Sequence, residues 1–139
     1  MFQIGYRPEC QHILVRNVGF HTFADVDGFF PNIQAAARVA RRDCGVARIL
    51  IDSSRSMVQS KEMIAAVDRH PRLVPDHCDR LAIVMNSVLT RMQTARLFHD
   101  DDTERTFDQM LDALEWLHQG DDRDWRELAA HYAGTDFFS

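Results

Sequence analysis

Runs of apolar residues alternate along this chain with stretches of helical spacing. Ile49-Leu50-Ile51 is followed by an acid and several hydroxyl residues, and Leu81-Ala82-Ile83-Val84 is equally apolar at consecutive positions. Strands that are apolar on both faces are typical of a parallel sheet covered by helices. We therefore expect these two segments to be neighbouring strands that run in the same direction.

The N-terminal segment predicts a β-hairpin. Phe2, Ile4 and Tyr6 alternate with polar or small residues, as in a half-buried strand, and Pro8 interrupts the pattern. The apolar pattern returns at residues 12–18. These two strands are expected to pair antiparallel.

The longest helical pattern follows the hairpin. Thr22 with Asp25 three residues later resembles a capping box, and Gly45 suits the position after the last turn. Pro31 inside the pattern predicts a kink or a break, because proline removes a backbone hydrogen bond. The expected buried face consists of Phe23, Val26, Phe30, Ile33, Ala37 and Ala40.

Shorter elements complete the chain. A second helix is expected near residues 60–70, and a short edge strand at residues 104–107. Ser87 is expected to cap a third helix, and Asp108 a fourth. The expected inward-facing residues are Val88, Met92, Ala95 and Phe98 in the third helix, Met110, Leu111, Leu114 and Leu117 in the fourth, and Trp125, Leu128, Ala129 and Tyr132 in a last helix in the tail.

This succession predicts an α/β fold with a mixed, largely parallel β-sheet that begins with the hairpin. Residues 1–119 form the expected domain, and residues 120–139 form a C-terminal helical extension packed on or beside it. A chain of 139 residues can build one domain with a substantial core, and it needs neither a metal nor a disulfide to fold.

Composition narrows the classes of function. The formal net charge of −5 argues against nucleic-acid binding, which requires a basic surface. No apolar stretch approaches the length of a membrane span, and the N-terminus lacks the pattern of a signal peptide. Cys10, Cys44 and Cys78 have no metal-ligand spacing and are expected to be reduced thiols. We therefore expect a cytoplasmic, bacterial-type protein without metal or cofactor.

The candidate working surface follows the strand at Ile49–Ile51, because ligands of parallel sheets gather at the carboxyl ends of strands. The expected interaction or switch loop comprises Asp52, Ser53, Ser54, Ser56, Ser60 and Lys61. Its serines could accept phosphate near a helix N-terminus, or they could simply cap: Ser56 with Gln59 has capping-box spacing, and Ser60 could cap alone. Asp52 is either a functional acid or the acceptor of an Asx-turn.

Other side chains are candidates for contacts with a bound ligand. Arg91 is the candidate contact for a carboxylate or phosphate, with a solvated surface arginine as the alternative. A second group could line an adaptable apolar groove or belong to the core. Its members are Met57, Met63, Met85, Met92 and Phe98.

Metal and catalytic motifs are not evident in the sequence. His70, His77, Cys78 and Asp79 lack the second ligand pair that a zinc site needs. Neither a nucleophile elbow nor a glycine-rich phosphate loop occurs, so no catalytic residue is predicted.

Five stretches share a pattern with a known family. They are Gly19-Phe20-His21-Thr22, Ile49-Leu50-Ile51-Asp52 leading to Val58-Gln59-Ser60, Arg80-Leu81-Ala82-Ile83-Val84, Leu89-Thr90-Arg91-Met92-Gln93-Thr94-Ala95-Arg96, and Phe107 through Ala113-Leu114-Glu115-Trp116-Leu117. On these stretches the chain resembles the SpoIIAA-like small domains, which are related to the STAS (sulphate transporter and anti-sigma-factor antagonist) and SEC14-like lipid-carrier folds. The resemblance covers about residues 1–119.

The resemblance implies a β–α superhelical core and a non-catalytic role. In anti-sigma-factor antagonists a phosphorylatable serine or threonine stands at the start of the second helix. Here Gln59-Ser60-Lys61-Glu62 occupies that place, with Lys61 at the acceptor position and Ser60 one residue early.

Two functional hypotheses follow. The leading one is a STAS-like regulatory or protein-interaction module that uses residues 53–60 and the following helix, and its expected sign is an exposed apolar patch beside that loop. The second is a carrier or sensor of a small apolar or lipid-like ligand in a groove between sheet and helices. A homodimer closed by Phe137-Phe138 is a further option. A third hypothesis, a small hydrolase, would need a base within hydrogen-bond reach of a serine or cysteine.

Overall fold

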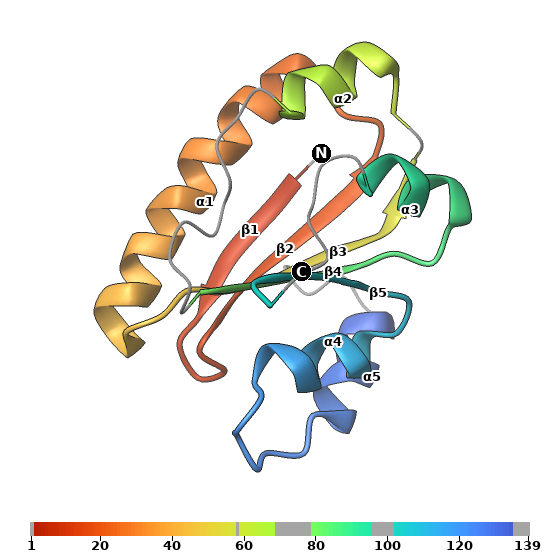
Figure 1. Cartoon of the computed structure of the whole chain (residues 1–139). Helices are drawn as coiled ribbons and strands as arrows, with labels where there is room; N and C mark the ends of the chain where they lie inside the picture. The colour runs from red at the N-terminus through yellow and green to blue at the C-terminus, as the bar shows by residue number, and fades with distance from the viewer. Residues whose placement is uncertain (1, 58, 69–78, 96–101, 135–139) are drawn as a thin grey trace.

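The computed structural model describes residues 2–57, 59–68, 79–95 and 102–134 (Figure 1). In these residues five strands form one sheet in the order β1-β2-β3-β4-β5. The strands are β1 (Phe2–Arg7), β2 (His12–Gly19), β3 (Arg48–Ser56), β4 (Arg80–Val84) and β5 (Glu104–Phe107). The helices are α1 (Phe23–Cys44), α2 (Lys61–Asp68), α3 (Val88–Thr94), α4 (Met110–Leu117) and α5 (Arg126–Gly134).

Strand pairing makes the sheet mixed. β1 and β2 form the expected antiparallel hairpin, whereas β2, β3, β4 and β5 pair in parallel. Ile49 of β3 lies opposite Leu81 of β4, and Ile51 lies opposite Ile83. The prediction of two neighbouring, like-directed apolar strands is therefore confirmed, and so are the α/β class, the mixed sheet and the edge strand at residues 104–107.

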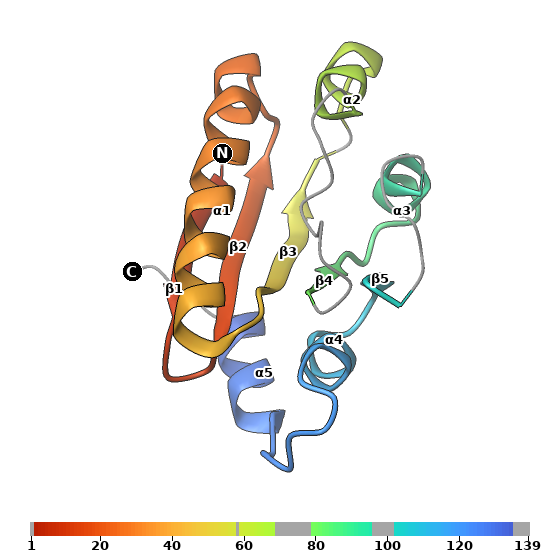
Figure 2. The same ribbon diagram turned by 60° about the vertical axis from the view of Figure 1, so that its left-hand side comes forward.

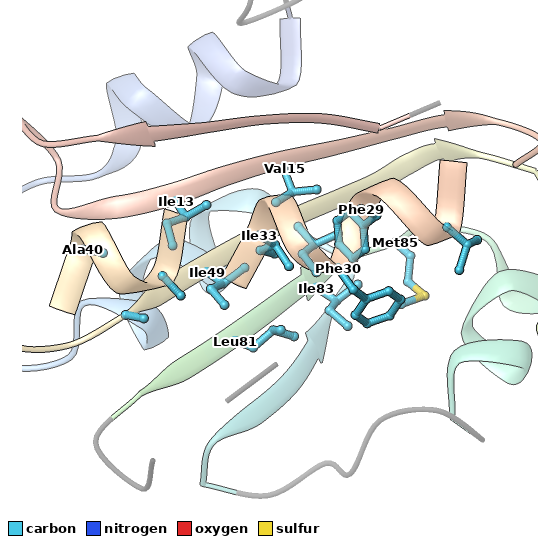
Figure 3. Packing of buried hydrophobic residues seen from close by; sticks show 14 of the residues in the cluster. Ile13, Val15, Phe29, Phe30, Ile33, Ala40, Ile49, Leu81, Ile83 and Met85 are labelled. Atoms are coloured by element: carbon cyan, nitrogen blue, oxygen red, sulfur yellow. The ribbon is translucent and has the colours of Figure 1, made fainter. Parts of the chain in front are cut away.

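Helices cover both faces of the sheet, which explains why its inner strands are apolar throughout. Successive residues of a strand point to opposite faces. One face packs against α2 and against α1 (the latter seen in Figure 3) and carries Ile13, Val15, Ile49, Ile51, Leu81 and Ile83. The opposite face packs against α4 and α5 and carries Leu14, Leu50, Ala82 and Val84. Figure 1 shows α1 and the α4–α5 pair on opposite sides of the sheet.

Helix α1 begins and ends at the predicted signals. The Thr22 hydroxyl accepts a hydrogen bond from the Asp25 N–H (3.0 Å), and the Asp25 carboxylate accepts one from the Thr22 N–H (2.9 Å). This reciprocal pair is a capping box. At the other end Gly45 has a φ of 86°, and its N–H donates to the Arg41 carbonyl (2.9 Å). A left-handed φ of this kind favours glycine.

Of the kink or break predicted at Pro31, the break does not occur, because α1 continues through the proline to Cys44. An interior proline removes only one backbone hydrogen bond. The side chains next to it, Phe30 and Ile33, are buried against the sheet and hold both halves of the helix in place (Figure 3).

The starts of the later helices differ in how well the sequence predicts them. Ser87 caps α3 as expected, with its hydroxyl accepting from the Thr90 N–H at 3.5 Å. The prediction that Asp108 caps α4 is wrong, because Gln109 holds the cap position and makes no side-chain capping bond. Helix α4 starts at Met110, so Asp108 lies one residue too early to cap it.

Some predictions fall outside the described residues. These concern Phe98, the pair Phe137-Phe138, and the residues His70, His77 and Cys78. In the part of the chain that the structure describes, no helix combines the length and the apolar character needed to cross a bilayer.

Candidate functional site

Strand β3 extends further at its carboxyl end than its sequence indicates. Residues 52–56 were expected to form a loop, and this prediction is wrong because β3 extends to Ser56. A register shift in β2 between Arg16 and Val18 lets the two strands continue, with Arg55 opposite Val18 and Ser56 opposite Gly19. Backbone pairing with β2 thus outweighs the loop preference of this hydroxyl-rich segment.

Asp52 is a buried structural acid. It is 2% exposed, and its Oδ2 lies 3.1 Å from Nη2 of Arg16, which is also fully buried. Its other oxygen, Oδ1, accepts hydrogen bonds from the N–H and the hydroxyl of Ser54, at 3.0 and 2.6 Å. The bonds from Ser54 are the Asx-type bonds that the sequence left open. The contact with Arg16 adds an ion pair between β2 and β3.

The serines of this segment have different partners. Ser60 caps α2, with its hydroxyl accepting from the Met63 N–H at 3.1 Å, and Lys61 is exposed at the first helical position. Ser53 accepts from the Asn17 side-chain amide at 2.9 Å. Ser56 does not cap, because it lies inside β3, where its hydroxyl donates to the Met57 carbonyl. Capping therefore describes Ser60 and not Ser56.

Gln59 joins the two loops that follow β2 and β3. Its side-chain Oε1 accepts from the His21 N–H at 3.0 Å. Its Nε2 donates to the carbonyls of Gly19 at 3.2 Å and Met57 at 2.5 Å. The Met57 N–H in turn donates to the Gly19 carbonyl at 3.1 Å. One amide side chain therefore fixes the start of α1 relative to the chain that enters α2.

Gln93 extends this arrangement to α3. Its Oε1 accepts from the Gln59 N–H at 2.9 Å, and its Nε2 donates to the Gln59 carbonyl at 2.7 Å. The carboxyl ends of β2, β3 and β4 thus meet in one hydrogen-bonded surface, with the starts of α1, α2 and α3 around it (Figures 1 and 2). We call this surface the carboxyl edge.

The carboxyl edge is strongly apolar. The described part of the chain has seven large apolar side chains that are exposed, and all except Val39 flank this edge. They are Phe20, Phe23, Met57, Val88, Leu89 and Met92. Their exposed surfaces sum to on the order of 700 Å², taking roughly 200 Å² for each fully exposed large residue.

The exposure of α3 overturns a prediction. Val88 and Met92 were expected to face inward, but they are 72% and 64% exposed, and Ala95 is exposed as well. Helix α3 turns Thr90 inward instead, and the Thr90 hydroxyl donates to the Ser87 carbonyl at 3.0 Å. Phe23, predicted on the buried face of α1, is 54% exposed. Helical spacing identifies an apolar face, but it does not identify what covers that face.

The methionines of the predicted groove are divided between core and surface. Met63 and Met85 belong to the core on the α1 face of the sheet. Met57 and Met92 are exposed at the carboxyl edge. The four therefore do not line one surface together. Arg91, the predicted anion contact, is exposed on α3 between the two apolar residues Leu89 and Met92.

Comparison of the chain with protein-family models, with curated proteins and with solved structures gives no match. The resemblance to the SpoIIAA-like domains therefore stays a prediction.

A second polar cluster lies under α5; sequence reasoning missed its two histidines, although it correctly predicted that Trp125 and Tyr132 face inward. His12 of β2 is fully buried, and its Nδ1 lies 2.8 Å from Nε2 of His118. Its Nε2 lies 3.0 Å from the Tyr132 hydroxyl. The Trp125 ring stacks on His118 with centroids 4.1 Å apart. The cluster joins β2, the end of α4 and α5.

Burial governs the titration of this cluster. It lowers the pKa of His12 to about 3, and His118 when protonated and the positive charge of Arg123 act in the same direction. Burial also lowers the pKa of His118 to about 4, opposed only by Asp121 among the nearby charges. Both imidazoles are therefore neutral at pH 7, and they join α4 and α5 to the sheet by hydrogen bonds instead of by charge.

A hollow of about 350 Å³ lies beside this cluster, at the turn between α4 and α5. Its walls are largely polar and include Glu115, Asp121, Arg123, Asp124 and Arg126. Arg126 and Asp124 pair with each other at 2.7 Å. His118 and Trp125 of the cluster also line this hollow.

Proposed function

We propose that the chain is a non-enzymatic protein-interaction module whose binding surface is the carboxyl edge. One observation carries the proposal: six of the seven exposed large apolar side chains in the described residues gather where three strands end. The summed exposed surface of these six residues, on the order of 700 Å², is comparable to the roughly 800 Å² that each partner contributes to a standard protein interface.

The rigidity of the carboxyl edge supports the same role. Five hydrogen bonds of the Gln59 and Gln93 side chains connect the loops and α3 before any partner arrives. A surface that is already ordered loses less conformational entropy on binding. Phenylalanine and methionine, which make up four of the six exposed side chains, are enriched in interfaces.

A protein partner accounts for the site better than a small apolar ligand does. A groove for such a ligand would place its apolar lining inside the fold. Here two of the predicted lining residues, Met63 and Met85, are core residues, and the other two described ones are exposed on the surface.

Site-specific photo-cross-linking in the native cells tests the proposal. A photoreactive residue in place of Met92 should form a covalent adduct with one defined protein, identified by mass spectrometry. The matched control carries the same residue in place of Val39, which is exposed on α1 away from the edge. The adduct should disappear when Leu89→Arg is added. Equal adducts at positions 92 and 39, or none at 92, would contradict the proposal.

A further inference from the structure

The two buried histidines under α5 have room for only one proton between them. His12 Nδ1 and His118 Nε2 lie 2.8 Å apart, so one of these nitrogens donates and the other accepts. The second nitrogen of His12 lies 3.0 Å from the Tyr132 hydroxyl of α5. An imidazolium carries a proton on both nitrogens. If both rings were charged, two N–H groups would point at each other, so this contact requires at least one neutral ring. We call these two residues the histidine pair.

The surroundings of the histidine pair disfavour added positive charge. Both side chains are buried, so water does not solvate them. Arg48 and Arg123 act against a charged ring at both histidines, and Asp121 favours charge only at His118. The ionisable groups that face the pair and its Tyr132 contact are Arg7, Glu9 and Cys10 from β1 and its turn, Arg48 from β3, Asp121 and Arg123 from the turn between α4 and α5, and Tyr132 from α5.

Helix α5 covers a part of the sheet that is unusually polar for a protein core. The buried ion pair of Arg16 and Asp52 contacts α5, because Arg16 Nη2 also donates to the Tyr132 carbonyl at 2.7 Å. Burial of charged groups costs free energy, since they lose their water. Release of α5 would return both the ion pair and the histidine pair to water. This gain offsets part of the apolar contact that Trp125, Ala129 and Tyr132 make with the core.

Helix α5 is also peripheral to the sheet. The five strands pair with one another in the order β1 to β5, without α5. The core cluster packed against α1 lies on the opposite face of the sheet. Figures 1 and 2 show α5 beside α4, at the end of the molecule away from α2. The backbone pairing of the sheet can therefore persist when α5 is displaced.

The histidine pair, the polar strip and the peripheral position of α5 point to one device. We propose that α5 is a proton-operated latch, which stays docked on the sheet while the histidine pair is neutral and is released when both imidazoles bind a proton. In the released form both rings reach water and titrate near their ordinary pKa of about 6.5. In the docked form their pKa values are about 3 and 4. Lowering the pH from 7 to 5 therefore raises the equilibrium constant for release by up to about 500-fold.

Amide hydrogen exchange of the full chain at pH 7 and pH 5 tests the latch, with each rate corrected for the intrinsic effect of pH. The α5 amides should be less protected than those of β3 and β4 at both pH values, because α5 opens without the sheet. Their protection should fall at least about a hundredfold between pH 7 and pH 5. His131→Gln removes an exposed histidine of the same helix, so it is the matched control and should keep this response.

Two variants separate proton uptake from loss of packing. His118→Gln keeps a polar side chain but cannot become charged, so the response of α5 to pH should shrink to about 25-fold or less, the effect of one histidine. Tyr132→Phe removes the hydroxyl that contacts His12. It should lower α5 protection at both pH values and keep the response to pH, because both histidines remain.

Three results would overturn the latch. The first is α5 protection equal to that of β3 and β4 at both pH values, which means that α5 opens only with the whole domain. The second is α5 protection that does not change between pH 7 and pH 5. The third is a response that His118→Gln leaves at its wild-type size. Circular dichroism at pH 7 checks the fold of each variant, and the first two results come from the wild-type chain alone.

Discussion

The ion pair between Arg16 and Asp52 allows the sharpest quantitative test of the packing. Asp52→Asn keeps the shape of the side chain but removes its charge. Arg16 then remains in the interior at 1% exposure without the Asp52 carboxylate. Its Nε and Nη2 lose a carboxylate oxygen at 3.2 and 3.1 Å, and it keeps the bond from Nη2 to the Tyr132 carbonyl at 2.7 Å.

The expected loss is large relative to the stability of a small domain. Removal of one partner of a buried pair costs about 3–5 kcal/mol. The retained bond to Tyr132 places Asp52→Asn near the lower end, at about 3 kcal/mol. Domains of this kind have about 5–15 kcal/mol in total. Asp122→Asn, at an exposed position between α4 and α5, is the matched control and should change stability by less than about 0.5 kcal/mol.

Urea unfolding followed by circular dichroism measures these differences, with the slope m checked for each variant. Arg16→Met should cost a similar amount, since it leaves the Asp52 carboxylate and the Tyr132 carbonyl without this partner. The double variant Arg16→Met/Asp52→Asn should lose at least about 1 kcal/mol less than the sum of the single losses. Additive losses, or a loss below about 1 kcal/mol for Asp52→Asn, would refute the account of this pair.

Two further predictions concern titration and capping. Because burial lowers the pKa values of His12 and His118 to about 3 and 4, the unfolded chain takes up protons first as the pH falls below about 6.5. The free energy of unfolding should fall by up to about 1.4 kcal/mol per pH unit for each histidine between pH 6.5 and about 4. Urea unfolding at pH 7, 6 and 5 measures this dependence. A free energy of unfolding that stays constant over these three pH values would contradict the prediction. Ser60→Ala should lower stability by about 1 kcal/mol through loss of the α2 cap, whereas Ser56→Ala should change it by less than half as much; equal effects in thermal unfolding would argue against the cap.

The sheet could be predicted from the sequence because its determinants are local. Consecutive apolar residues at Ile49–Ile51 and Leu81–Val84 require cover on both faces, and this requirement already indicates a parallel pair. The capping box of Thr22 and Asp25 is likewise written within four residues. Such signals do not depend on distant parts of the chain.

The site depends on distant parts of the chain, and this is why much of it could not be predicted. His12 meets partners 106 and 120 residues away, so no local pattern reveals their contact. The hydroxyl-rich end of β3 looks like a loop until β2 is placed beside it. Val88 has helical spacing typical of a core residue, but α3 buries Thr90 and leaves Val88 72% exposed.

Oxidative footprinting of the methionines tests the central claim, that the carboxyl edge is a protein interface. Met57 and Met92 lie at the edge, while Met63 and Met85 are buried and serve as internal references. In dilute purified protein, Met57 and Met92 should oxidise much faster than the references. In intact native cells, both should be protected together, to the level of Met63 and Met85. If Met57 and Met92 are oxidised in cells as fast as in dilute solution, the edge is not covered by a partner and the account is wrong.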